Sequence, residues 1–160
     1  MFRKILTLAA ALALTAVLPV AAQAEPGPAL RLTSMLAPHR VIDVVPDQVH
    51  NNGGWVHMWS YHGGKNQQWY WYSDHTIRPV LDTSMCLDME PIQQDGARLR
   101  VWKCNRSDSQ SFWLGTRDNI YAMYPRLNID VNPNTNRDGG QVYGWTGNGA
   151  IQQQWWRYLA

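Results

Sequence analysis

An aspartate, a tryptophan and a glutamine recur in the same order three times along the sequence, and together these side chains could hold a polar ligand. The sets are Asp43, Trp59 and Gln67, then Asp88, Trp102 and Gln110, then Asp130, Trp145 and Gln153. A carboxylate accepts charge-assisted hydrogen bonds, an indole ring offers a flat and rigid surface, and an amide both donates and accepts hydrogen bonds. The pattern therefore indicates candidate recognition sites, one in each third of the chain.

The spacing of these residues indicates a threefold internal repeat. A Gln–x–aromatic triplet begins at Gln67, Gln110 and Gln153, so the step is 43 residues both times. Three tryptophans and three glycines keep the same step: Trp59, Trp102, Trp145, Gly53, Gly96 and Gly139. A fixed period of this length is typical of structural units that bury a shared core between them.

Each recurring side chain also has a purely structural interpretation. A tryptophan within a strand is more often part of the core than a ligand platform. An aspartate ahead of a turn often ends a strand by bonding to nearby backbone, and a proline follows each aspartate by three residues, at Pro46, Pro91 and Pro133. The sequence leaves both interpretations open for the aspartates and tryptophans, whereas the glutamines are mainly structural under either.

The elements that must position these residues are short β-strands. No stretch after Leu30 has sustained helical periodicity, whereas strand-type alternation or β-rich composition marks residues 40–45, 55–61, 68–72, 98–103 and 141–145. Clusters of Gly, Pro, Asn and Asp separate these runs. The predicted class is all-β. A propeller has about four to eight blades, so a closed threefold β structure fits three repeats better, since closure removes exposed strand edges.

Residues 1–24 are predicted to be a signal peptide, which leaves residues 25–160 as one domain. Arg3 and Lys4 form a charged start, an apolar run follows, and Ala22, Gln23 and Ala24 form a small-x-small cleavage site. The apolar run is shorter than the roughly 20 residues that span a bilayer, so an uncleaved anchor is the weaker alternative. We expect a secreted chain without a membrane span.

Removal of the signal peptide would leave the chain almost uncharged. The full sequence has 14 Lys and Arg against 12 Asp and Glu, and the two charges lost with the signal peptide are both positive. Nucleic-acid-binding proteins carry local excesses of Lys and Arg, and this sequence has no basic run. We therefore expect no nucleic-acid partner.

The two cysteines, Cys86 and Cys104, predict a disulfide, because both lie in the middle repeat of a chain expected in an oxidising compartment. The close cysteine pairs that zinc sites usually contain are absent. The stretch from Asp130 to Asn134 resembles a calcium loop only in part, because Thr135 stands where the sharp-turn glycine belongs. No serine sits in a nucleophile-elbow motif. We expect no metal, no cofactor and no catalytic residue.

The repeat resembles the ricin-type β-trefoil lectin domain, and the resemblance covers nearly all of residues 25–160. Subdomains of that family carry a Cys-Leu-Asp element, an aliphatic–x–x–Trp–x–Cys strand and a terminal Gln-x-Trp. The middle repeat matches them at residues 86–88, 99–104 and 110–112. The resemblance implies a β-trefoil, a six-stranded barrel capped by three hairpins around a pseudo-threefold axis, with Trp69, Phe112 and Trp155 in the core.

The resemblance also implies a shallow sugar site in each repeat. In the first repeat, Asp43 would accept hydrogen bonds from sugar hydroxyls and Trp59 would stack on the C–H face of the ring. Asn66 would supply an amide, and Gln67 would hold Asp43 in place. At a position that often carries Gln, the three repeats have His57, Arg100 and Tyr143, which leaves the preferred sugar open.

The other two repeats depart from this pattern. The third repeat offers Asp130, Trp145 and Gln153, with Gln152 where the family has Asn. The second repeat offers weaker candidates, Asp88, Trp102 and Gln110, with the shorter Ser109 in the Asn place. We therefore expect the first repeat to bind best, the third less and the second least.

The expected function is recognition of glycans without catalysis, through one to three shallow sites. The expected partners are galactose-like units or units of plant or cell-surface polysaccharides. The alternative is a protein-interaction module, such as a protease inhibitor or a toxin-adhesion subunit, on a β-trefoil with degenerate sugar sites. The departures at Ser109 and Gln152 favour that alternative, with a protein as the partner.

Overall fold

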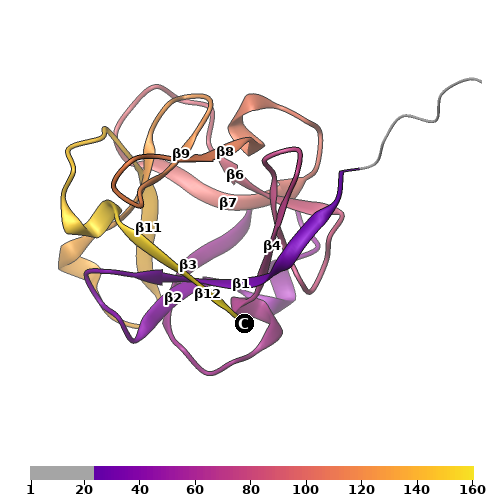
Figure 1. Ribbon diagram of the computed structural model, residues 1–160, viewed down its shortest axis with the longest axis horizontal. Helices are drawn as coiled ribbons and strands as arrows, with labels where there is room; N and C mark the ends of the chain where they lie inside the picture. The colour runs from indigo at the N-terminus through magenta and orange to yellow at the C-terminus, as the bar shows by residue number, and fades with distance from the viewer. Residues whose placement is uncertain (1–23) are drawn as a thin grey trace, which may run out of the picture.

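The computed structural model describes residues 24–160, which form short β-strands with single turns of 3-10 helix between them (Figure 1). The predicted signal peptide lies outside the described residues, apart from its last residue. Within the described part of the chain, no helix is long and apolar enough to cross a membrane.

The strands are β1 Pro26–Ser34, β2 Arg40–Val44, β3 Gly54–Ser60, β4 Trp69–Tyr72, β5 Ile77–Pro79, β6 Met85–Met89, β7 Ala97–Lys103, β8 Phe112–Leu114, β9 Ile120–Ala122, β10 Asn128–Val131, β11 Gly140–Trp145 and β12 Trp155–Leu159. The 3-10 helices are η1 Pro46–Gln48, η2 Lys65–Gln67, η3 Asp108–Gln110, η4 Pro133–Thr135 and η5 Ile151–Gln153.

Six of the strands form a closed ring. Strand β1 pairs with both β12 and β4, β4 pairs with β5, and β8 pairs with β9, all antiparallel. Two equivalent backbone hydrogen bonds complete the ring, from Phe112 N–H to the His75 carbonyl at 2.8 Å and from Trp155 N–H to the Asp118 carbonyl at 3.0 Å. Figure 1 shows β1 and β12 side by side, so the two ends of the described chain meet in this ring.

The remaining strands form three hairpins, β2–β3, β6–β7 and β10–β11, that cap the ring. The second strands of the hairpins, β3, β7 and β11, each pair with the other two. This mutual pairing places a pseudo-threefold axis between them. The ring and its cap are the predicted β-trefoil, and the all-β class is confirmed.

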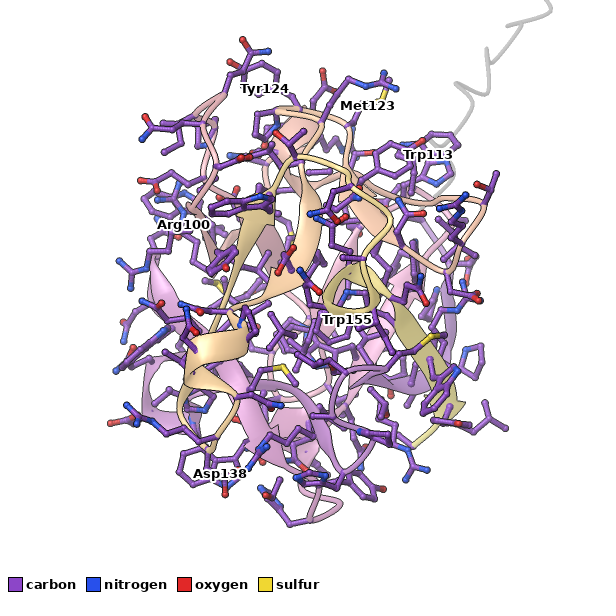
Figure 2. The ribbon with its side chains drawn as sticks, turned by 90° about the vertical axis from the view of Figure 1, so that its left-hand side faces the viewer. Arg100, Trp113, Met123, Tyr124, Asp138 and Trp155 are labelled. Atoms are coloured by element: carbon purple, nitrogen blue, oxygen red, sulfur yellow. A yellow bond between two sulfur atoms is a disulfide. The ribbon has the colours of Figure 1, made fainter. Side chains whose placement is uncertain are left out.

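The core is built from the aromatic residues that end the three repeats. Trp69, Phe112 and Trp155 are at most 1% exposed, as predicted, and Figure 2 shows Trp155 inside the molecule. A buried indole N–H needs an acceptor. Trp69 donates to the Ile42 carbonyl at 3.1 Å and Trp155 to the Ile129 carbonyl at 2.9 Å. Phe112 has no such group, so it fills the equivalent position without a partner.

The equally spaced glycines lie in the turns of the three hairpins, where each repeat contacts another repeat. Gly53, Gly96 and Gly139 have φ of +83°, +91° and +75°, a left-handed conformation that glycine adopts without steric cost. The residue before each glycine accepts a hydrogen bond from the backbone N–H at the end of another repeat's strand. These pairs are Asn52 with Lys103 at 2.8 Å, Asp95 with Thr146 at 2.6 Å and Asp138 with Ser60 at 2.8 Å.

The predicted disulfide between Cys86 and Cys104 is present. It joins the β6–β7 hairpin at its open end, where the two Cα atoms are 5.0 Å apart. The first repeat has Val41 and Tyr61 at the corresponding positions. Among the described residues, the second hairpin is thus the one closed by a covalent bond.

Candidate functional site

The first-repeat site consists of Asp43, His57, Trp59, Asn66 and Gln67. Asp43, near the end of β2, is 2% exposed. Its Oδ2 accepts hydrogen bonds from Asn66 Nδ2 at 2.8 Å and Gln67 Nε2 at 2.9 Å. Its Oδ1 lies 3.2 Å from His57 Nε2. The helix η2 brings Asn66 and Gln67 to the carboxylate, so this predicted set is assembled around one buried acceptor.

A cavity of about 470 Å³ opens in front of this carboxylate, lined by Asp43, Val45, Pro46, His57, Trp59, His62 and Asn66. Pockets for small ligands have volumes of roughly 300–1,000 Å³. The indole of Trp59 is 38% exposed at the cavity wall, and the His57 ring stacks on it with a centroid distance of 5.2 Å. Trp59 is therefore not a core residue.

The glutamines are structural in all three repeats, as the sequence indicated. Gln67 Nε2 donates to the Ser60 carbonyl at 3.0 Å, and its Oε1 accepts from the His62 N–H at 2.8 Å. Gln110 and Gln153 make the equivalent pairs of hydrogen bonds. Each glutamine thus ties the end of its hairpin to the following 3-10 helix. Gln67 and Gln153 also brace their aspartate.

The second-repeat site consists of Asp88, Arg100, Trp102 and Ser109, which line a cavity of about 370 Å³. Arg100 Nε donates to Asp88 Oδ1 at 3.0 Å, and Ser109 Oγ donates to Oδ2 at 3.1 Å. The Arg100 guanidinium carbon lies 4.4 Å from the centre of the Trp102 ring. Arg100, at the edge of the molecule in Figure 2, therefore contacts both the carboxylate and the aromatic ring, and a ligand in the cavity would compete with it for these two groups.

The third-repeat site, Asp130, Tyr143, Trp145 and Gln153, has an open aromatic surface but fewer hydrogen bonds. Trp145 is 37% exposed, so it is not a core residue. Gln153 Nε2 donates to Asp130 Oδ2 at 2.8 Å. Burial, opposed by the Gln153 hydrogen bond and supported by the nearby Asp95 charge, raises the pKa of Asp130 to about 6. No hydrogen bond joins Gln152 to Asp130 among the described residues, so its predicted amide contact is not made here.

The model of the ricin-type β-trefoil lectin domain family matches residues 29–155. The chain belongs to this family. A lectin domain of this kind is a carbohydrate-binding module. The curated relative agglutinin-1 of Abrus precatorius is 29% identical to the chain over 109 residues, which are 68% of this chain and 19% of the relative. The chain thus spans about a fifth of the length of that relative.

Solved structures agree with the lectin fold. The β-trefoil lectin of the Vibrio vulnificus hemolysin/cytolysin, with N-acetyl-D-lactosamine bound, has a TM-score of 0.68 at 22% identity and covers 82% of this chain and 94% of its own. The designed threefold-symmetric protein ThreeFoil has a TM-score of 0.70 at 24% identity and covers 81% of this chain and 96% of its own. At these identities the likeness shows the β-trefoil fold.

The position that the sequence linked to sugar preference lies opposite each aspartate of this lectin domain. His57, Arg100 and Tyr143 are the cross-strand partners of Asp43, Asp88 and Asp130, respectively. The sequence identified this shared position but did not pair it with the aspartates. Whether such a residue leaves the site open depends on its hydrogen bonds and stacking, which the sequence does not give.

Proposed function

We propose that this lectin domain recognises galactose-like units of extracellular glycans without cleaving them, chiefly through the first-repeat site. The third-repeat site would bind more weakly, and the second-repeat site, where Arg100 holds the carboxylate and lies over Trp102, would bind least. The observation that carries this proposal is the cavity at Asp43, where a braced carboxylate faces a half-exposed indole. The proposed location of the chain is outside the cell.

The groups at this cavity match the two faces of a sugar. Hydroxyls on the sugar edge would donate to the Asp43 carboxylate, and hydrogen bonds to a charged acceptor are the stronger kind. The patch of C–H bonds on one sugar face would lie on the Trp59 ring. Asn66 and Gln67 already hold the carboxylate, so little ordering would be needed on binding.

One further observation supports this assignment. The Vibrio lectin with a similar fold holds N-acetyl-D-lactosamine, a disaccharide that contains galactose. A shallow single site of this type should be weak, and two sites that engage one glycan surface could raise the avidity by about 10²–10⁴.

No observation favours the alternative of a protein-interaction module. The first repeat keeps every predicted sugar-binding group around one cavity. Ser109, whose short side chain favoured the alternative, does reach its aspartate at 3.1 Å. In the second repeat, Arg100 would instead compete with a sugar for Asp88 and Trp102.

A glycan array tests the proposal. Purified protein should bind galactose-terminated glycans, and Trp59→Ala should lose most of this signal. Trp113→Ala is the matched control, because Trp113 is also 38% exposed but lies in β8 and does not line the cavity at Asp43. Figure 2 shows it on the opposite side of the view from Arg100. Absence of any glycan signal for the wild-type protein, or equal signals for wild type and Trp59→Ala, would contradict the proposal.

A further inference from the structure

Three exposed side chains surround the pseudo-threefold axis on the outer face of the cap. They are Trp55, Arg98 and Gln141, the second residues of β3, β7 and β11, and they are 43 residues apart. Although the three positions are equivalent, they hold an aromatic ring, a cation and an amide. Together with Gly96, Leu99, Val142 and Tyr143 they line a cavity of about 410 Å³, here called the axial cavity.

Cross-strand pairing places one residue between each aspartate and the residue of its row that surrounds the axis. On β10, β11 and β7, Asp130 pairs with Tyr143 and Tyr143 pairs with Arg98. Directly paired residues lie on the same face of a sheet. Neighbouring strands lie about 4.8 Å apart, so the row from Asp130 to Arg98 covers roughly 10 Å. The equivalent rows run through His57 to Gln141 and through Arg100 to Trp55.

In the third row, the middle residue is not hydrogen-bonded to its aspartate and lines the axial cavity instead. His57 and Arg100 each hydrogen-bond to the aspartate of their own repeat, at 3.2 and 3.0 Å. No such bond joins Tyr143 to Asp130 among the described residues, and Tyr143 lines the axial cavity. Its ring is also 5.3 Å from that of Trp145, centroid to centroid. Tyr143 therefore belongs to the third-repeat site and to the axial cavity at once.

The lining of the axial cavity offers an aromatic face and hydrogen-bond donors, two kinds of group that can hold a sugar. Trp55 is 43% exposed and offers an aromatic face. The Arg98 guanidinium has one hydrogen bond, to the Gly53 carbonyl at 3.3 Å, and no carboxylate partner in the described part of the chain. Its remaining N–H groups can donate. A Cβ added at Gly96 would meet no atom within 4 Å, so the cavity is open on that side.

Gln141 and Tyr143 add two further donors. The Gln141 Oε1 accepts a hydrogen bond from Asn132 at 2.9 Å, which leaves its amide N–H groups for a ligand. Burial, together with the charges of Asp130 and Asp95, raises the pKa of Tyr143. Its hydroxyl therefore stays protonated at neutral pH and can donate to a sugar oxygen.

We propose that the axial cavity is a further sugar subsite, continuous with the third-repeat site through Tyr143. The third repeat then binds an oligosaccharide of two or more units and gains affinity with chain length. This inference rests on the proposed function, because it assumes that the third-repeat site holds a sugar. It adds a preference for extended glycans that the single sites do not have.

Chain-length dependence tests this inference. The probes are methyl β-galactoside, the disaccharide N-acetyllactosamine and the tetrasaccharide with two N-acetyllactosamine units. All titrations use the Trp59→Ala background, which silences the first-repeat site and leaves a chain that should fold. The tetrasaccharide should bind at least tenfold more tightly than methyl β-galactoside. Trp55→Ala and Arg98→Ala should each reduce this ratio to below threefold, while the affinity for methyl β-galactoside stays unchanged.

Two controls separate the possible failures. Trp113→Ala, in the same background, should keep the tenfold ratio. Equal affinity for all three probes, or a ratio that survives both axial substitutions, would overturn the axial subsite and leave the proposed function standing. Failure of the unmodified protein to bind any of the probes would overturn the galactose-binding proposal itself, and the axial subsite with it.

Discussion

The first and second hairpins have the same backbone and nearly the same sequence pattern, yet they differ at the one position that faces the aspartate. In the first, His57 contacts Asp43 and stacks on Trp59, which remains 38% exposed at the cavity. In the second, Arg100 binds Asp88 and covers Trp102. The second hairpin also carries the disulfide. From this comparison we propose that the first repeat serves recognition and that the second contributes chiefly to stability.

Removing the disulfide should have the largest effect on stability. The double variant Cys86→Ala/Cys104→Ala should lose about 3 kcal/mol of the free energy of unfolding, because a bridge that closes a loop of this size restricts the unfolded chain. Denaturant melts measure this loss, and wild-type protein treated with reductant is the control. Sugar binding by the folded fraction should not change. A loss below about 0.5 kcal/mol would mean that the second hairpin holds without its bridge.

Removing the exposed tryptophan should weaken sugar binding in the first hairpin but not in the second. Trp59→Ala should weaken binding of N-acetyllactosamine more than tenfold, or about 1.4 kcal/mol, as is common at a binding hot spot. Trp102→Ala should change it less than twofold. Because Trp59 is 38% exposed, its removal should cost little stability. Calorimetric titration and thermal melts measure the two effects. Unfolding of Trp59→Ala would show that the indole supports the core after all.

Replacing the arginine should turn the second hairpin into a binding site. Arg100→Gln keeps a donor for Asp88 and uncovers Trp102. It should cost roughly 1–3 kcal/mol of stability through the lost charge-assisted hydrogen bond. The NMR signal of the Trp102 indole N–H should then shift on addition of N-acetyllactosamine. Arg157→Gln, which removes an exposed ion pair with Asp118, is the control. A silent Trp102 signal in folded Arg100→Gln would contradict the blocking role of Arg100.

The third-repeat site should respond to pH, with the smallest effect. Since the pKa of Asp130 is raised from 3.8 to about 6, the carboxyl is protonated below that pH and loses its charge as an acceptor. Binding there should weaken between pH 7 and pH 5, as reported by the Trp145 indole signal. In stability, the folded chain holds this proton more tightly than the unfolded chain. The stabilisation that this proton gives the folded chain is fully present below about pH 3.8 and is lost as the pH rises through 6.

The control for the pH effect is Asp130→Asn, which has no proton to exchange in this range. Its stability should lose the step between pH 4 and pH 6 that the wild type shows. A wild-type profile that is identical to that of Asp130→Asn would mean that Asp130 titrates at its ordinary pKa.

Much of the fold could be predicted because the repeat is regular. The five predicted β-rich runs correspond to β2, β3, β4, β7 and β11 to within a residue or so at each end, and the Gln–x–aromatic step located the core rings. The strands β5, β8 and β9 have three residues each. An alternating pattern cannot be recognised over so short a stretch.

The state of each candidate site could be predicted only in part. The sequence located Asp43, Trp59, Asn66 and Gln67, which the structure brings together. It attributed the predicted weakness of the second repeat to Ser109, although that hydroxyl reaches Asp88 and it is Arg100 that contacts both Asp88 and Trp102. A substituted residue can be seen in a sequence, but the direction in which a long side chain folds depends on its partners in three dimensions.

A crystal structure of the protein with N-acetyllactosamine tests the central claim most directly. The account predicts a galactose ring against Trp59, with its hydroxyls within hydrogen-bonding distance of Asp43. Trp102 should remain covered by Arg100. Sugar density on Trp102, with the first-repeat cavity empty at the same sugar concentration, would contradict the account.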